Sequence, residues 1–170
     1  MAAALLILAS LLVRTPSPEY FLMDPDGGVQ LAAAQQIRLT GEQPWIDFYV
    51  PYGPLVYYLS FLGQWASGDR LIGEIVLCVV GYGIAYLALF AATLRRSGSP
   101  VVAFSLVIVL LLVVPRYYKY YLVLAPALGL LALVAGAGWQ GNRRAVVLGL
   151  AAAVGVGFRL DLGAFVAVAE

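Results

Sequence analysis

The apolar stretch 71–94 constrains the fold of this sequence more than any other feature. A helix needs about 20 mainly apolar residues to cross the hydrocarbon core of a bilayer, which is about 30 Å thick, and this stretch is long enough to do so alone. The composition agrees, because 63% of the residues are hydrophobic and 11% are charged, against about 45–50% and about 25% in a soluble domain. The sequence therefore predicts an all-α integral membrane protein.

Three further apolar stretches, 101–114, 121–139 and 145–158, follow along the chain. We expect each to be a membrane span that flanking aromatic and polar residues complete. Pro126 lies inside the second stretch, where it can kink a helix. The third is rich in Ala and Gly, so its backbone can approach a neighbouring helix closely. Together these spans predict a single transmembrane domain over residues 1–170.

Both ends of the sequence read as incomplete spans. Residues 1–13 are apolar over only about 18 Å as helix, and 163–170 look like the start of another span. We therefore expect this sequence to be the N-terminal fragment of a longer chain. A signal peptide is the alternative reading of the start, but the basic segment that such a peptide requires is not there.

The sequence has no His and a single Cys, Cys78, within an apolar run. These counts exclude a disulfide or a His/Cys metal site within this chain, and they favour Cys78 as a small buried hydrophobic residue. The net charge is +1 and there is no basic tract, so nothing points to nucleic acid as a partner.

A long loop, 14–70, precedes the first full span and carries two expected helices, 26–39 and 54–66. The second of these has apolar and aromatic side chains at i, i+3, i+4 and i+7 from Leu55, which is helical spacing. It could span the membrane, or it could lie in the interface as an amphipathic helix. That choice decides on which side of the membrane every later loop lies.

If 54–66 lies in the interface, the loops sort by charge. The loops 95–100 and 140–144 contain arginines and no acid, which predicts that both are cytoplasmic. The acids fall on the outer side, together with one aromatic belt. Its members are Trp45, Tyr49, Tyr52, Tyr57, Tyr58, Tyr117, Tyr118, Tyr120 and Tyr121. If 54–66 spans instead, acids and aromatics scatter over both faces, so we prefer the interfacial arrangement, which places 14–70 outside.

Asp24, Pro25 and Asp26 form a D-x-D motif directly after the first apolar run. Two carboxylates this close can bind a divalent cation such as Mg²⁺ or Mn²⁺ through hard oxygen ligands. Alternatively, one of them can act as a general base towards an acceptor hydroxyl. The structural alternative is that Asp24 and Pro25 simply begin a helix, as a cap and its first residue.

Over residues 15–100 the sequence resembles the GT-C membrane glycosyltransferases, such as the bacterial aminoarabinose transferase and the protein O-mannosyltransferases. The matching order is Asp24 and Asp26, a helix over 29–39, Gly41, Trp45-Ile46-Asp47-Phe48, Gly53-Pro54-Leu55-Val56-Tyr57-Tyr58, Arg70-Leu71 and Arg95-Arg96. The stretch from Phe158 to Gly163 is similar to a later outward loop of bacterial members. The family's common acidic pair is Asp-Glu, whereas position 27 is glycine here, so Asp26 takes the place of the first acid and Asp24 supplies the second charge.

The resemblance implies N-terminal helices of a GT-C bundle in the bacterial inner membrane, and transfer of a sugar from a polyprenyl-phosphate donor to a lipid, glycan or protein acceptor. It makes Asp26 and Asp24 the catalytic carboxylates. Asp47 and Tyr57 are the candidate sugar contacts, because a carboxylate beside aromatic rings suits a sugar. The carrier phosphate needs cations at the outer interface, and the candidates are Arg70, Arg116, Lys119 and Arg159.

Each of these candidates also has a structural interpretation. Arg70 can pair with Glu74 at i+4, Arg159 can pair with Asp161, and the other cations can snorkel to the interface. Asp47 can be a turn residue.

Two other functions compete with glycosyl transfer. A non-catalytic GT-C-like or structural membrane protein would keep the fold without needing Asp26. A transporter is less favoured, because the spans 101–114, 121–139 and 145–158 contain no ionisable residue.

Overall fold

The computed structural model describes residues 25–113, 119–136, 139 and 141–168. Within these residues all regular structure is α-helical, apart from one isolated bridge between Pro44 and Phe48. The helices are α3 (Pro25–Thr40), α4 (Pro54–Ser67), α5 (Ile72–Ser97), α6 (Pro100–Val113), α7 (Tyr121–Gly136), α8 (Asn142–Phe158) and α9 (Leu160–Val168). The expectation of an all-α chain is confirmed. The partial span 1–13 lies outside the described residues.

Several helix ends differ from those expected. Helix α5 continues past residue 94 through Arg95 and Arg96, because basic side chains are favourable in the last turn of a helix. Gly98 ends it in the left-handed conformation, with φ of 66°. Helix α8 takes in Asn142 before the expected start at 145, and α9 begins at Leu160 rather than at 163. The short α8–α9 turn therefore leaves only Arg159 between the two helices.

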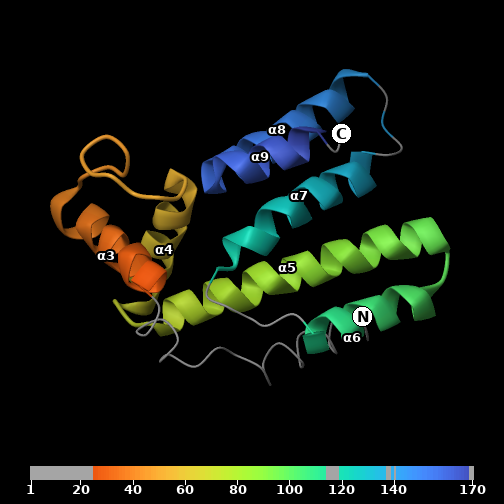
Figure 1. The fold of residues 1–170 in the computed structure, drawn as a ribbon, viewed down its shortest axis with the longest axis horizontal. Helices are drawn as coiled ribbons and strands as arrows, with labels where there is room; N and C mark the ends of the chain where they lie inside the picture. The colour runs from red at the N-terminus through yellow and green to blue at the C-terminus, as the bar shows by residue number, and fades with distance from the viewer. Residues whose placement is uncertain (1–24, 114–118, 137–138, 140, 169–170) are drawn as a thin grey trace.

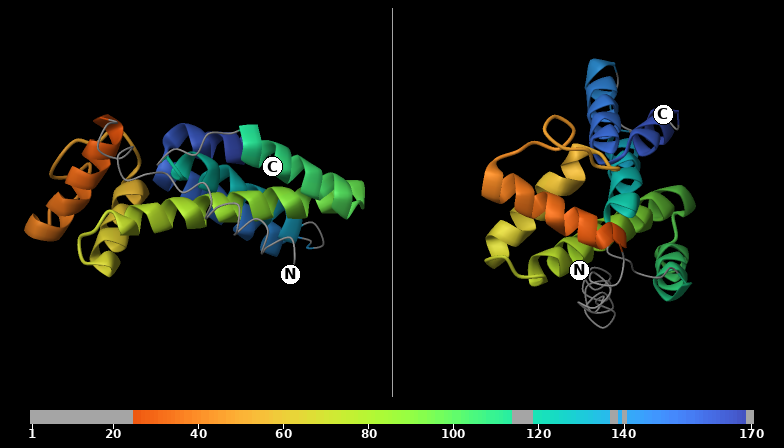
Figure 2. Two further views of the ribbon diagram at one scale, coloured as in Figure 1. Left: turned by 90° about the horizontal axis from the view of Figure 1, so that it is seen from below. Right: turned by 60° about the vertical axis from the view of Figure 1, so that its left-hand side comes forward.

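Helix α5 is the long axis of the structure (Figure 1). It packs against α7, α6 and α4, while α8 packs on both α7 and α9. Figure 2 shows α3 and α4 together at one end of the structure, inclined steeply to α5. Helix α4 contacts α3, α5 and α8. It therefore lies across the end of the other helices instead of running alongside them.

The core next to this end is rich in tyrosine. Tyr57 of α4, Tyr82 and Tyr86 of α5, and Tyr120 and Tyr121 at the start of α7 are all buried. The expectation of a single aromatic belt is therefore corrected for three of its members, Tyr57, Tyr120 and Tyr121, which pack between helices. Trp45, Tyr49 and Tyr58 are exposed, whereas Tyr117 and Tyr118 lie outside the described residues.

One described helix, α5, is long and apolar enough to cross a membrane, while α6 and α7 are shorter apolar helices. At 26 residues α5 is about 39 Å long, whereas the 14 residues of α6 give about 21 Å. A membrane domain with several spans stays a prediction.

The end opposite α3 and α4 carries the α5–α6 and α7–α8 turns (Figure 1). These are the two purely basic loops of the sequence, with Arg95, Arg96, Arg143 and Arg144. The Arg95 guanidinium donates a hydrogen bond to the carbonyl oxygen of Val134 near the end of α7, which ties the two turns together. The structure therefore has a basic end and, where α3 and α4 lie, an end that carries the acids. We call the second the capped end.

Candidate functional site

The Trp45–Tyr52 loop of the capped end is built around Asp47. Its Oδ2 accepts a hydrogen bond of 2.7 Å from the backbone N–H of Gln43, and the Trp45 N–H donates to the Phe48 carbonyl at 2.8 Å. The Trp45 indole Nε1 donates to the Tyr52 carbonyl at 2.7 Å, which closes the loop. Asp47 is exposed and acts as a turn residue in this structure. This is the structural interpretation given above, and the contact of Asp47 with a sugar stays a prediction.

Tyr57 anchors the beginning of α4. Its ring is fully buried, and its hydroxyl accepts a hydrogen bond of 3.1 Å from the Tyr52 N–H. The next backbone N–H, that of Gly53, donates to the Phe158 carbonyl at the end of α8, at 2.9 Å. The Tyr52 ring also packs on Tyr121, with 5.1 Å between ring centroids. These contacts seat the first loop on the α8–α9 turn, and they leave no open face of Tyr57 for a substrate.

Arg159 and Asp161 form a bidentate ion pair in that turn. Arg159 Nε lies 2.8 Å from Asp161 Oδ1, and Nη2 lies 2.6 Å from Oδ2. The hydrogen bonds from Arg159 lower the pKa of the Asp161 carboxyl, and those bonds raise the pKa of Arg159 in return. Asp161 Oδ1 also accepts the Leu162 N–H at 3.0 Å. The pair therefore stabilises the α8–α9 turn, which is its structural interpretation from the sequence.

A buried polar cluster, absent from the sequence-based candidates, joins α3, α4 and α5. Its members are Gln30, Ser60, Gln64 and Glu74, each no more than 4% exposed. The Ser60 hydroxyl donates to Glu74 Oε1, and Gln30 Nε2 donates to Glu74 Oε2 at 3.2 Å. Gln64 Nε2 lies 3.3 Å from Ser60 Oγ and 3.5 Å from Glu74 Oε1. A carboxyl group removed from water is tolerated when donors satisfy it, so this cluster fixes α3 on the other two helices.

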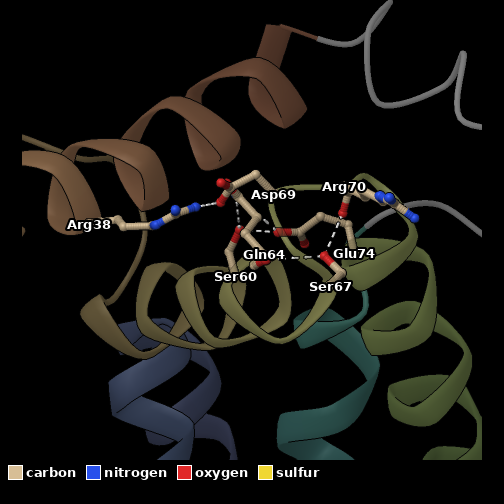
Figure 3. A network of polar contacts seen from close by, with 7 residues as sticks. All are labelled: Arg38, Ser60, Gln64, Ser67, Asp69, Arg70 and Glu74. Atoms are coloured by element: carbon tan, nitrogen blue, oxygen red, sulfur yellow. Dashed lines mark hydrogen bonds and ion pairs between the residues drawn. The ribbon is translucent and has the colours of Figure 1, made fainter.

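Arg70 stands beside this cluster but outside it (Figure 3). The expected Arg70–Glu74 pair is wrong, because Glu74 turns inward to the donors of α3 and α4. The neighbouring acid, Asp69, is already paired with Arg38 in the last turn of α3. The Arg70 side chain is exposed and points away from the cluster in Figure 3. It makes no hydrogen bond or ion pair with any residue that the structure describes.

The remaining predicted site residues are only partly placed. Asp24 and Arg116 lie outside the described residues. Asp26 is in the first turn of α3, four residues before Gln30, so the two positions share a helix face. Lys119 is half-buried and directly precedes the buried Tyr120. Over the described ranges no three Asp, Glu, His or Cys side chains gather around a possible metal ion, and the metal at Asp24 and Asp26 stays a prediction.

Comparison with protein-family models, with curated proteins and with solved structures found no match in any of the three.

Proposed function

We propose that this chain is the N-terminal part of a membrane glycosyltransferase that moves a sugar from a polyprenyl-phosphate donor to an acceptor at the outer face of the bacterial inner membrane. The basis is the resemblance of residues 15–100 to GT-C enzymes. One observation of the structure carries the proposal further. The two segments that share the resemblance, 45–58 and 158–163, are far apart in sequence but meet through the Gly53–Phe158 hydrogen bond, and the ring contact of Tyr52 with Tyr121 lies beside it.

The arrangement of helices supports a membrane orientation for this proposal. Helix α5 can cross a bilayer, and Figure 1 shows α6, α7 and α8 beside it, with the α5–α6 and α7–α8 connections at one end and the end of α8 towards α4. The purely basic turns share one end, which fits the cytoplasmic side. Helix α4 crosses the other end (Figure 2), as an interfacial helix would. The capped end, with Asp26 on α3, then lies where a polyprenyl-phosphate carrier places its sugar.

The proposed chemistry needs a carboxylate that the helix packing does not consume. Asp47 and Asp161 are held by local hydrogen bonds, and Glu74 is buried. The resemblance to GT-C enzymes assigns the first acid to Asp26, with Asp24 as the second charge, so we propose Asp26 as the base that removes a proton from the acceptor hydroxyl. Its helix is fixed by two separate contacts, Gln30 with Glu74 and Arg38 with Asp69, which suits a residue whose position matters.

The test is sugar transfer from polyprenyl-phosphate sugars by the protein reconstituted in proteoliposomes. Asp26→Asn keeps the size of the side chain but removes its charge, and we expect at least about a hundredfold loss of rate, the usual contribution of a general base. Asp47→Asn is the matched control on the same face of the membrane, where we expect a small change. Normal transfer by Asp26→Asn would remove this residue from the mechanism.

A non-catalytic membrane protein with the same fold is the second candidate. The observation that favours it is that Asp47, Tyr57 and Arg159 all have structural roles. No transfer with any polyprenyl-phosphate sugar, from a protein that is correctly inserted, would support this alternative.

A further inference from the structure

A groove between α4 and α5 opens beside Arg70. It has a volume of about 440 Å³, within the range of about 300–1,000 Å³ that is usual for ligand pockets. Its walls are apolar and come from Leu62 and Ala66 of α4 and from Ile72 and Val76 of α5. Leu62, Ile72 and Val76 are each about half exposed. A long hydrocarbon chain could therefore enter the groove from the side.

The floor of the groove is the crossing point of the two helices, and glycine makes it possible. A Cβ atom at Gly73 would collide with the carbonyl oxygen of Gly63. The backbones of α4 and α5 can be this close only because neither residue has a side chain. Beside this crossing, the small side chain of Ala66 leaves space in the groove that a larger side chain would fill.

The charge at the rim of the groove suits an anionic head group. Ser67 and Ile72 line the groove, and Arg70 lies in the turn between them, with its carbonyl accepting the Ser67 hydroxyl at 2.8 Å. The two acids nearest to Arg70 in the described sequence are engaged elsewhere, Asp69 by Arg38 and Glu74 by the buried cluster. An exposed guanidinium of this kind binds phosphate oxygens through two parallel hydrogen bonds.

We propose that this groove holds the first part of the prenyl chain of the polyprenyl-phosphate donor, and that Arg70 binds its phosphate. The inference rests on the proposed function for the identity of the lipid. With α4 in the outer interface, the start of α5 lies at the border of the hydrocarbon layer. The phosphate then meets Arg70 at the interface while the chain descends along Ile72 and Val76.

The test uses Trp65, which is exposed on α4 and lies one turn after Leu62. In a Trp45→Phe/Trp139→Phe background it is the only tryptophan of this chain. Nanodiscs of brominated phosphatidylcholine quench its fluorescence where lipid touches α4, and decaprenyl phosphate that enters the groove displaces the quencher. We expect saturable recovery of fluorescence with decaprenyl phosphate, and much weaker recovery with decaprenol or phosphatidylglycerol.

Variants separate the head-group contact from the groove. Arg70→Gln should raise the apparent Kd for decaprenyl phosphate about tenfold to a hundredfold, the usual value of a charged hydrogen bond. Ala66→Phe should weaken binding of both decaprenyl phosphate and decaprenol by filling the groove. Arg143→Gln is the matched control, because Arg143 lines an apolar groove of about 300 Å³ at the basic end. It should leave binding unchanged.

Several results would overturn the site. Unchanged binding by Arg70→Gln would do so, and equal recovery with phosphatidylglycerol would show a bulk anionic lipid instead. Trp65 that is not quenched at all, in a protein that proves dimeric, would show that a second copy covers the groove. Arg70-dependent binding without any sugar transfer would support the site and refute the proposed enzyme, whereas transfer with an unchanged KM in Arg70→Gln would refute only the site.

Discussion

The capped end and the basic end hold their charges in different ways. At the capped end, Glu42, Asp47, Asp69, Glu74 and Asp161 each accept a hydrogen bond or an ion pair. At the basic end Arg95, Arg96, Arg143 and Arg144 are all exposed, and the turns that carry them contain no acid. The acids of the capped end are therefore held by specific polar contacts, whereas the arginines of the basic end are exposed and only Arg95 has a hydrogen bond among those given above, to the Val134 carbonyl. This contrast predicts that single substitutions matter much more at the capped end.

The largest expected contrast is in labelling by a membrane-impermeant thiol reagent. Ser97→Cys and Asn142→Cys at the basic end should be unreactive from outside, because both turns are expected to be cytoplasmic. Ile46→Cys at the capped end should react fully, since Ile46 is 75% exposed. The only native cysteine of the chain, Cys78, is buried and gives little background. Reaction of both basic-end cysteines from outside would reverse the topology.

Glu74→Ala should lower the free energy of unfolding strongly. It removes the acceptor shared by the Ser60 and Gln30 side chains, and each buried donor left unsatisfied costs about 1–3 kcal/mol. We expect a loss of roughly 3 kcal/mol, measured by detergent-denaturant titration in micelles. Arg96→Ala at the basic end is the control and should change stability by less than about 0.5 kcal/mol. Equal losses for the two variants would contradict the contrast between the ends.

Two glycines compare the close helix crossing at the capped end with an open position in the middle of α8. Gly73→Ala places a methyl group against the Gly63 carbonyl and should cost about 1–3 kcal/mol as an overpacked contact. Gly149 lies inside α8, and a Cβ atom added there would have nothing within 4 Å. Gly149→Ala should therefore stabilise the protein by up to about 1 kcal/mol through helix propensity. Thermal midpoints of the two variants should move in opposite directions.

The smallest expected effect concerns Asp161. Its pKa in the folded state lies below the ordinary value of 3.8 because Arg159 binds the charged form. The pair therefore contributes stability above that value, and the contribution is lost as the pH falls through the lower folded-state pKa. The difference in thermal midpoint between the wild type and Asp161→Asn should be small at pH 7, since the pair is exposed. It should vanish in strong acid, and a difference that grows on acidification would contradict this account.

The sequence predicted the helices well and the polar contacts less well, for a physical reason. Apolar runs and helical spacing are local, so they locate α5, α6 and α7 to within a few residues. The turn at Asp47 and the Arg159–Asp161 pair are also local. Glu74 was missed because its donors lie 14 and 44 residues earlier in the chain. The local i, i+4 spacing suggested Arg70 as the partner of Glu74, whereas tertiary packing gives Glu74 the donors Gln30 and Ser60.

The position of Glu74 also bears on how the protein is made. Every described side chain that donates to its carboxyl group precedes it in sequence, at positions 30, 60 and 64. A ribosome therefore finishes all of these donors before α5 emerges. The carboxyl near the start of α5 would be expensive to expose to lipid, but α3 and α4 are already available to receive it. In the proposed membrane arrangement, a chain in which α3 and α4 followed α5 would have to insert α5 before the donors to its acid had been made.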